Sequence, residues 1–269
     1  PAQRQGAARP LLEALPEVGH EAHAVRAPGE ARLVDAGSVV GLAAHEGRQD
    51  GREDPLLDDL VSRHEELVAE QLERRDIRDV RVLEAIRTVP RHLFVPEPLR
   101  GEAHADSPVP IGYEQTISQP YIVAFMTQAL DVRPDHVVLE IGTGSGYQAA
   151  VLSLLARQLY TIEIIPPLAS QARATLEELG YRNIQVRTGN GYLGWPEHGP
   201  FDRIMVTAAP DEVPPALVQQ LKIGGLMAIP VGSASQELRI LRRTAAGWKI
   251  VTTRCRFIVA EGLSDRPAR

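Results

Sequence analysis

The sequence predicts an α/β fold: a doubly wound, mostly parallel seven-stranded sheet that ends in a C-terminal antiparallel hairpin and is preceded by helices. After residue 136, five short apolar runs alternate with segments of helical periodicity, which is typical of a parallel sheet covered on both faces. Two more apolar runs follow, joined by a link over residues 244–247 that is short enough to require antiparallel pairing.

Helical periodicity begins in the N-terminal third. Apolar residues recur at helical spacing over residues 56–72 and again over 80–86, so two helices are predicted there. Pro90 ends the second helix. The proline-bearing stretch over 94–110 is predicted to cross the core irregularly, as a lid or entry region.

The alternating part begins with a predicted helix over residues 120–130. The parallel strands are expected over residues 137–141, 159–164, 183–187, 203–208 and 226–231. The helices between them are expected over residues 147–156, 168–179 and 214–221. Gly180 and Gly224-Gly225 follow the last two helices, where glycine commonly ends a helix. The closing hairpin is predicted over 238–242 and 248–258.

Composition separates the first 55 residues from the rest. Ala, Gly, Pro, Arg and Glu dominate them, and no aromatic residue precedes Phe94, so they have little apolar area to offset the entropy of ordering. We therefore expect a disordered extension over 1–55, an N-terminal helical or lid region over 56–112, and the core over 113–269.

Charge and composition argue against several classes of partner. The net charge of −6 comes without a dense basic run, so nucleic acid is not an expected partner. No apolar run approaches the length of a membrane span, and Glu30 and Asp35 interrupt what a signal sequence would need. Cys255, the single cysteine, is expected to be a buried thiol in a cytoplasmic monomer. His20 and His23 have no neighbouring ligand cluster, so no metal site is expected.

Three alternating glycines, at positions 142, 144 and 146, follow the first predicted strand. Such a turn lets a ligand approach main-chain N–H groups at a helix N-terminus. Glu163 ends the next strand, at the distance expected of a carboxylate that binds a ribose. A dinucleotide fingerprint would need glycine where Tyr147 stands, so the spacing fits S-adenosylmethionine (SAM) better. A turn that only joins strand to helix is the alternative.

Five segments of the chain stand out: residues 115–121 (QTISQPY), 138–147 (VLEIGTGSGY), 189–195 (GNGYLGW), 206–210 (VTAAP) and 229–232 (IPVG). With these segments the chain resembles the protein-L-isoaspartate (D-aspartate) O-methyltransferase family, which repairs isomerised aspartates. The glycine segment is shared by many methyltransferases, whereas residues 115–120 and 207–210 are specific to this family. The similarity runs from about Leu56 to about Ile258.

The resemblance implies the Rossmann-like fold of SAM-dependent methyltransferases. It also implies a carboxyl O-methyltransferase that esterifies the free α-carboxylate of isoaspartyl residues in damaged proteins and peptides, with S-adenosyl-L-homocysteine as the second product. Two alternatives remain open: a SAM-dependent enzyme with another acceptor, and a non-catalytic SAM-binding module.

The resemblance places the family's catalytic serine at Ser118, with Thr116 and Gln115 shaping the same wall. On the residues alone, Ser118 could equally cap the helix that begins at Pro120. No general base is expected, because an α-carboxylate with a pKa of about 3.5 is more than ~99% ionised at pH 7. The site must instead compensate for removing water from that carboxylate; the Ser118 hydroxyl and unpaired N–H groups at the helix start are the candidates.

The expected SAM site combines the glycine turn with the ends of the neighbouring strands. Its residues are Glu140, Gly142, Thr143, Gly144, Ser145, Gly146, Glu163, Asn190, Gly191, Thr207 and Ala208. The glycines would face the methionine and ribose, Glu163 the ribose hydroxyls, and Asn190 with Gly191 the adenine. Glu140 either anchors the glycine turn or bonds to backbone there. Tyr192 and Trp195 are either adenine contacts or, more in keeping with their type, packing residues.

Two positions depart from the family pattern. Asn190 stands where an acid is usual, which we expect to weaken the adenine contact by roughly 1 kcal/mol through the loss of charge assistance, without abolishing it. Glu114 stands where a glycine is common, so the backbone that enters the Gln115 segment is expected to differ.

Overall fold

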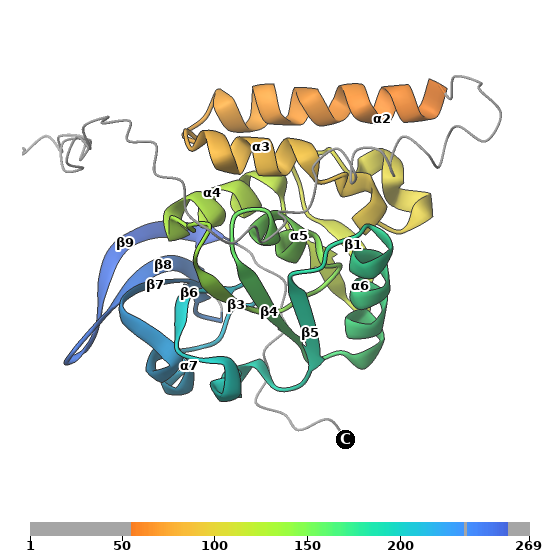
Figure 1. The fold of residues 1–269 in the computed structure, drawn as a ribbon. Coiled ribbons are helices and arrows are strands. Elements are labelled where there is room, and N and C mark those ends of the chain that lie inside the picture. Colours follow the sequence, from red (N-terminus) through yellow and green to blue (C-terminus); the bar gives the residue numbers. More distant parts are fainter. Residues whose placement is uncertain (1–54, 234–235, 258–269) are drawn as a thin grey trace, which may run out of the picture. The chain divides into compact units, whose positions relative to one another are not determined.

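The computed structural model describes residues 55–233 and 236–257, all within one compact unit (Figure 1). Residues 1–54 of the predicted extension, with His20 and His23, lie outside the described part. So does the side chain of Cys255. The expectations for these residues stay predictions.

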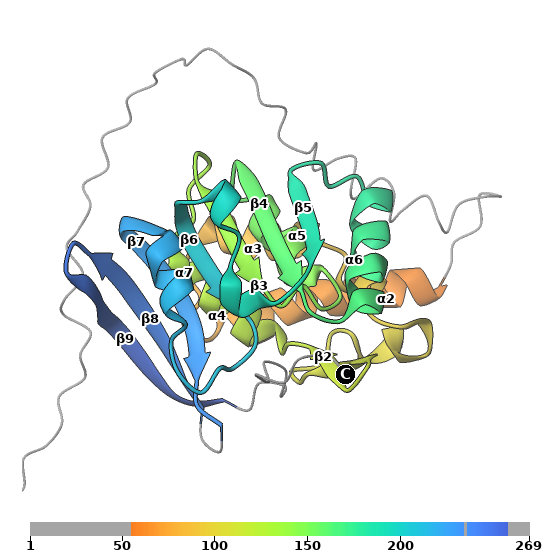
Figure 2. The same ribbon diagram turned by 90° about the horizontal axis from the view of Figure 1, so that it is seen from below.

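A seven-stranded sheet forms the centre of this unit, in the order β5-β4-β3-β6-β7-β8-β9. The strands are β3 (Val137–Ile141), β4 (Gln158–Glu163), β5 (Ile184–Thr188), β6 (Phe201–Val206), β7 (Leu221–Val231), β8 (Gln236–Thr244) and β9 (Gly247–Phe257). The first five in chain order pair in parallel, and β8 pairs antiparallel with both β7 and β9. The predicted sheet and hairpin are confirmed, and β9 forms an edge (Figure 2).

Helices cover both faces of the sheet. Those of one face are α4 (Pro120–Leu130), α5 (Tyr147–Ser153) and α6 (Pro166–Glu178), and α7 (Pro215–Gln220) covers the other. Successive side chains of β3 point to opposite faces: Val138 packs in the cluster of α4 and α5, and Leu139 packs in the cluster of α7. This two-sided burial explains the near-continuous apolar strands.

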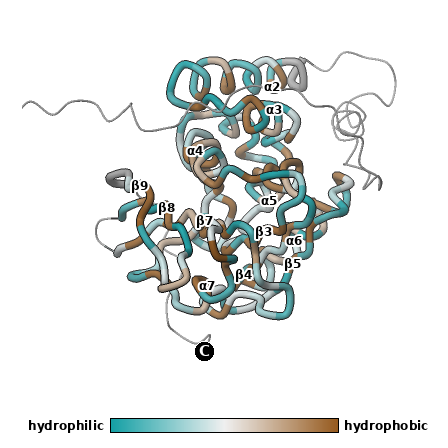
Figure 3. Tube along the Cα trace, turned by 60° about the vertical axis from the view of Figure 1, so that its left-hand side comes forward, coloured by the Kyte–Doolittle hydropathy of each residue, from teal (hydrophilic) through white to brown (hydrophobic). Residues whose placement is uncertain are grey.

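The N-terminal helices are α2 (Pro55–Glu66), the π-helical segment η1 (Leu67–Glu73) and α3 (Val80–Thr88). Segments η1 and α3 pack against α4, and α2 lies on the outer side of this layer (Figure 1). The predicted helices are confirmed, except that the end of the first is π-helical rather than α-helical. Apolar residues alternate with polar ones along these helices, whereas α4 is apolar over most of its length (Figure 3). This is because α4 lies between the sheet and the N-terminal layer.

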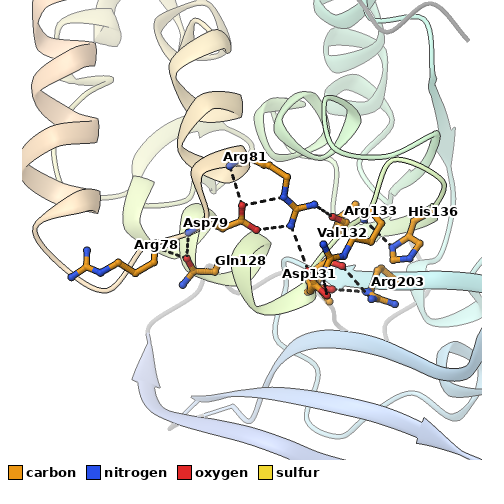
Figure 4. A network of polar contacts seen from close by, with 10 residues as sticks. Arg78, Asp79, Arg81, Gln128, Asp131, Val132, Arg133, His136 and Arg203 are labelled. Atoms are coloured by element: carbon orange, nitrogen blue, oxygen red, sulfur yellow. Dashed lines mark hydrogen bonds and ion pairs between the residues drawn. The ribbon is translucent and has the colours of Figure 1, made fainter. Parts of the chain in front are cut away.

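A polar network joins the start of α3 to the end of α4 (Figure 4). Oε1 of Gln128 accepts hydrogen bonds from the backbone N–H groups of Arg78 and Asp79, at 2.6 and 2.8 Å. Asp79 in turn caps α3 by accepting a hydrogen bond from the Arg81 N–H at 2.9 Å.

The hydrophobic core runs across the boundary that we proposed at residue 113, because one cluster of buried side chains contains residues from both sides of it. The division into a lid region and a core therefore stays a prediction.

A hairpin that the sequence did not predict leads into α4. After the 3-10 helices η2 (Arg91–Phe94) and η3 (Glu97–Glu102), strands β1 (Val109–Gly112) and β2 (Gln115–Ile117) pair antiparallel. The turn between them holds Tyr113 and Glu114 at φ angles of 53° and 59°. This left-handed conformation explains why glycine suits position 114, because a residue with a Cβ adopts it at a cost of about 1 kcal/mol.

Two element boundaries lie three or more residues from the predicted position, the start of β7 and the end of α5. Helix α7 ends at Gln220 and β7 begins at Leu221, so Gly224 and Gly225 lie inside the strand. They form an irregularity in the pairing with β6: Gly224 has a φ of +84°, and a Cβ on Gly225 would lie 2.8 Å from two carbonyl oxygens. Helix α5 ends at Ser153 instead of residue 156. Beyond its end, the side-chain amide of Asn183 donates hydrogen bonds to the backbone carbonyls of Ser153 and Ala156.

Candidate active site

The turn after β3 adopts a backbone path that favours glycine at three places. The φ angle is +95° at Gly142, +54° at Gly144 and +91° at Gly146, angles that residues with a side chain rarely adopt. A Cβ on Gly142 would also lie 2.3 Å from Oγ1 of Thr207, just after β6. Glycine is therefore required both by the turn itself and by the neighbouring strand.

Glu163 ends β4 and holds this turn in place. Its Oε2 accepts a hydrogen bond from the Gly144 N–H at 2.8 Å, and its Oε1 accepts one from the Ile165 N–H at 3.0 Å. A carboxylate offers about four acceptor sites, so about two remain for the hydroxyl groups of a ligand.

Glu140 lies beneath the turn, fully buried in β3. Its Oε2 accepts a hydrogen bond from the Thr161 hydroxyl at 2.5 Å, and that hydroxyl lies 2.7 Å from the hydroxyl of Thr143 within the turn. This chain of contacts favours the anchoring interpretation. Burial, together with the nearby charge of Glu163, raises the pKa of Glu140 to about 8, so its carboxyl is mostly protonated at pH 7.

Thr207 lies at the carboxyl end of β6, beside the same turn. Its hydroxyl donates toward the carbonyls of Ile141 and Gly142, at 3.0 and 2.7 Å. Strands β3 and β6 are neighbours from which the chain leaves in opposite directions across the sheet. Ligands of open α/β sheets bind at such a point.

The opposite wall is formed by the hairpin and the start of α4. Gln119 is the N-cap of α4 and no side chain caps this helix, so the capping interpretation of Ser118 is wrong. The expected N–H groups are also scarce: Pro120 has none, and those of Ile122 and Val123 bind the Gln119 carbonyl. The carbonyl of Ser118 accepts a hydrogen bond from Arg91 Nη2 at 2.8 Å.

The two walls enclose a cavity of about 530 Å³, within the range of small-molecule sites. Eleven of the residues proposed from the sequence line it: Gln115, Thr116, Ser118, Gly142, Thr143, Gly144, Ser145, Glu163, Gly191, Thr207 and Ala208. Glu140, Gly146 and Asn190 do not line it. Glu140 lies beneath the turn, Gly146 ends the turn with its Cα facing Leu176 and Ala172 of α6, and Asn190 precedes a lining residue.

Sequence reasoning missed half of the lining. The further lining residues are Pro108, Ile117, Gln119, Ile122, Val123, Ile141, Tyr147, Gln148, Ile162, Ile164 and Ile165. Those at the ends of β3 and β4 could have been found, because ligand sites of such sheets collect at the strands' carboxyl ends. The contribution of α4 depends on how that helix packs on the sheet, for which the sequence carries no local signal.

Asn190 lies outside the cavity, exposed at the N-cap of the 3-10 helix η4 (Gly191–Leu193). Its Oδ1 accepts a hydrogen bond from the Tyr192 N–H at 2.9 Å. Gly191 does reach the cavity, and a Cβ there would lie 2.3 Å from Cγ2 of Ile141. The backbone at position 191 thus approaches the sheet as closely as glycine allows.

Trp195 packs away from the cavity. Its ring lies edge-on to Tyr160, with centroids 5.4 Å apart, and the Arg187 guanidinium lies 4.3 Å from its ring centroid. Neither Trp195 nor Tyr192 lines the cavity, which favours the packing interpretation for both.

Within residues 55–233 and 236–257, no group of three or more His, Cys, Asp or Glu side chains is arranged to bind a metal ion. The same ranges contain no helix with the length and apolar content that crossing a bilayer requires.

Comparison with known proteins agrees with this geometry. A model of the protein-L-isoaspartate(D-aspartate) O-methyltransferase family matches residues 62–264. A protein-L-isoaspartate O-methyltransferase of Synechococcus is 59% identical over 199 residues, which are 71% of this chain and 82% of the relative. One from Picosynechococcus is 49% identical over 208 residues, which are 77% and 94% of the two chains.

Solved structures show the same fold. A protein-L-isoaspartate O-methyltransferase superposes with a TM-score of 0.64 at 31% identity, over 74% of this chain and 66% of that one. Another, from Plasmodium falciparum in complex with S-adenosyl-L-homocysteine, has a TM-score of 0.62 at 24% identity, over 75% and 99% of the two chains.

The parallel sheet with its antiparallel end, the glycine turn and the acid that ends β4 define a SAM-dependent methyltransferase. Within this class, the chain belongs to the protein-L-isoaspartate (D-aspartate) O-methyltransferase family.

Proposed function

We propose that this protein transfers the methyl group of SAM to the free α-carboxylate of isoaspartyl residues in damaged proteins and peptides. The observation that carries the proposal is the single cavity that joins the glycine turn and Glu163 to the Gln115–Ser118 segment. One wall has the features of a nucleoside site, and the other presents neutral polar side chains to an acceptor. The names of the relatives point to the same reaction.

The residues present fit SAM. Glycines at positive φ let a ligand lie against the backbone, and the remaining acceptor sites of Glu163 suit ribose hydroxyls. Gly191, with the adjoining Asn190, is proposed to border the adenine. When bound, SAM supplies an electrophilic methyl group on a sulfonium. The task of the protein is to hold the acceptor oxygen in line with that group, at about 3 Å.

The composition of the cavity suits an acceptor that is already anionic. Among the described residues that line it, Glu163 and Tyr147 are the titratable ones. Neither is needed as a base, because an α-carboxylate is ionised at neutral pH. The cost of removing water from that carboxylate must be met by hydrogen-bond donors. We assign this role to the hydroxyls of Ser118 and Thr116, with the Gln115 amide beside them.

An assay with an isoaspartyl peptide and methyl-labelled SAM tests the function. Label recovered in a base-labile ester of the peptide supports it. Label in another acceptor indicates a different methyltransferase, and SAM binding without turnover to any acceptor indicates a binding module. A matched peptide with normal aspartate is the substrate control and should stay unlabelled.

Ser118→Ala tests the assignment of the acceptor wall. We expect turnover to fall by about 10–100-fold, the effect of one lost hydrogen bond to a charged group. The affinity for S-adenosyl-L-homocysteine, measured by calorimetry, should change by less than about 3-fold. Ser170→Ala, an exposed position on α6, is the matched control. Unchanged turnover in Ser118→Ala would remove Ser118 from the site.

We further propose that the protein acts in the cytoplasm as a monomer, with isoaspartyl proteins as its partners and without nucleic acid or membrane. The net charge of −6 and the single cysteine support this. Sedimentation velocity of the full chain checks the monomer, and cell fractionation checks the location.

A further inference from the structure

Arg91 is a fully buried arginine in η2. Among the ion pairs of the described residues, none includes it. An arginine keeps its charge in proteins, and burying a charge without an opposite one costs several kcal/mol. A residue chosen only for packing would avoid this cost, and such violations concentrate at functional sites.

Two of the three side-chain nitrogens of Arg91 donate to backbone carbonyls that are far apart in the sequence. Nε donates to the carbonyl of Ala103 at 2.6 Å, and Nη2 donates to the carbonyl of Ser118 at 2.8 Å. Hydrogen bonds from a charged donor are short and strong. The guanidinium therefore fixes the backbone of Ser118 from outside the cavity.

The same guanidinium contacts the helix that follows the glycine turn. Its central carbon lies 4.7 Å from the ring centroid of Tyr147, the first residue of α5 and a lining residue of the cavity. Phe94, also in η2, packs edge-on against Tyr147 with centroids 5.6 Å apart. Cation–π contacts strengthen when they are buried. One short helix thus contacts both the acceptor wall and the cofactor wall.

We propose that Arg91 is a positioning residue for methyl transfer, which holds Ser118 at a fixed distance from the start of α5. The inference rests on the proposed role of Ser118 at the acceptor. Methyl transfer requires the acceptor oxygen to lie in line with the donor, and a misplacement of 1 Å can cost about 100-fold in rate. Arg91 meets this requirement without touching either reactant.

Arg91→Lys tests the proposal, because lysine keeps the charge but lacks the planar fork that reaches two carbonyls while stacking on a ring. We expect kcat with an isoaspartyl peptide to fall by about 10–100-fold. The dissociation constant of S-adenosyl-L-homocysteine should change by less than about 3-fold, because the glycine turn and Glu163 are intact. In a Ser118→Ala background the same substitution should add less than about 3-fold, since residues that act as a unit are not additive.

Arg203→Lys is the matched control. Arg203 also donates to two backbone carbonyls, those of Leu130 and Asp131, but it lies beyond the C-terminal end of α4, away from the cavity (Figure 4). The Arg203→Lys substitution should lower the melting temperature and leave kcat unchanged. The proposal would be overturned if Arg91→Lys left kcat unchanged, as the control does. It would also be overturned if the losses of kcat in Arg91→Lys and Ser118→Ala were fully additive in free energy in the double variant.

If Arg91→Lys does not fold, Phe94→Leu takes its place. This variant removes the aromatic ring that packs edge-on against Tyr147, the residue that the guanidinium contacts. It should lower kcat by a smaller factor than Arg91→Lys, and in a Ser118→Ala background it should again add less than about 3-fold. An unchanged kcat in Phe94→Leu would then overturn the proposal. A wild-type protein that fails to methylate the peptide would instead refute the proposed function, so the two failures are distinguishable.

Discussion

A buried histidine cluster makes the N-terminal layer sensitive to acid, and His104→Gln should change that sensitivity by a predictable amount. His64, His92 and His104 are 8%, 6% and 5% exposed, and the ring of His104 lies 5.2 and 6.1 Å from those of the other two. Burial lowers the pKa of His92 to about 4 and that of His104 to about 3. Nearby positive charges, including Arg100 and Arg91, act in the same direction.

The sign of the effect follows from proton binding. Between about pH 4 and pH 6.5 the unfolded chain protonates His92 and His104 while the native state leaves them largely neutral, so lowering the pH through this range favours unfolding. For His104, the free energy lost between pH 7 and pH 5 is about 2 kcal/mol. Glu140 opposes this: its raised pKa means that lowering the pH from 7 to 5 returns about 2.5 kcal/mol of stability. The wild-type curve is therefore a sum of opposing contributions, and the variant must be compared with it at each pH.

We expect the stability of His104→Gln relative to wild type to be about 2 kcal/mol more favourable at pH 5 than at pH 7. For a domain of this size that corresponds to about 4–8 °C in the relative melting temperature. Urea unfolding at both pH values, followed by circular dichroism, measures it. Depressed carboxyl pKa values, such as that of Asp202, affect stability only near and below their unfolded value of 3.8, so they do not contribute at pH 5. A stability difference that is the same at both pH values would refute the reasoning.

Three further predictions concern the cofactor side. Glu140→Gln should stabilise the protein at pH 7 by about 1–3 kcal/mol. Burying a carboxyl with a pKa of about 8 lowers the free energy of unfolding at pH 7 by about 3 kcal/mol, and an unpaired amide in the variant would cancel part of the gain. Urea unfolding at pH 7 and pH 5 measures it, and the stabilisation should be smaller at pH 5. Glu163→Ala should weaken SAM binding about 10–100-fold by calorimetry, and equal affinity would exclude Glu163 from the ribose site. Gly142→Ala should cost more than about 2 kcal/mol, because its φ of +95° is unsuited to alanine and the new Cβ would meet Thr207; thermal melting against Gly101→Ala, which has open space, provides the comparison.

Much of the site was predictable because its signals are local. The apolar run of β3 and the three glycines after it describe one strand and one turn, whose conformations depend on a few neighbouring residues. Glu163 could be placed beside that turn from spacing alone, because parallel neighbouring strands bring their carboxyl ends to one edge. Ser118 required the family resemblance, since on the residues alone a serine before a helix could equally be a cap.

The side chains around the site were not predictable in the same way. Glu140 and Glu163 stand at the ends of neighbouring strands, yet one is fully buried beneath the turn and the other faces the cavity. Asn190 points to its own 3-10 turn, where its Oδ1 accepts a hydrogen bond from the Tyr192 N–H. Arg91 showed no pattern at all, because its acceptors lie 12 and 27 residues away along the chain.

The sequence by itself determined the succession along the chain of the strands and helices from β3 onward, the glycine turn and the family, because periodicity, turn chemistry and motif spacing act over a few residues at a time. The tertiary structure alone decided which carboxyl is buried, which wall Ser118 joins and what Arg91 binds. These outcomes depend on desolvation and on contacts between distant segments, which exist only once the helices have packed on the sheet.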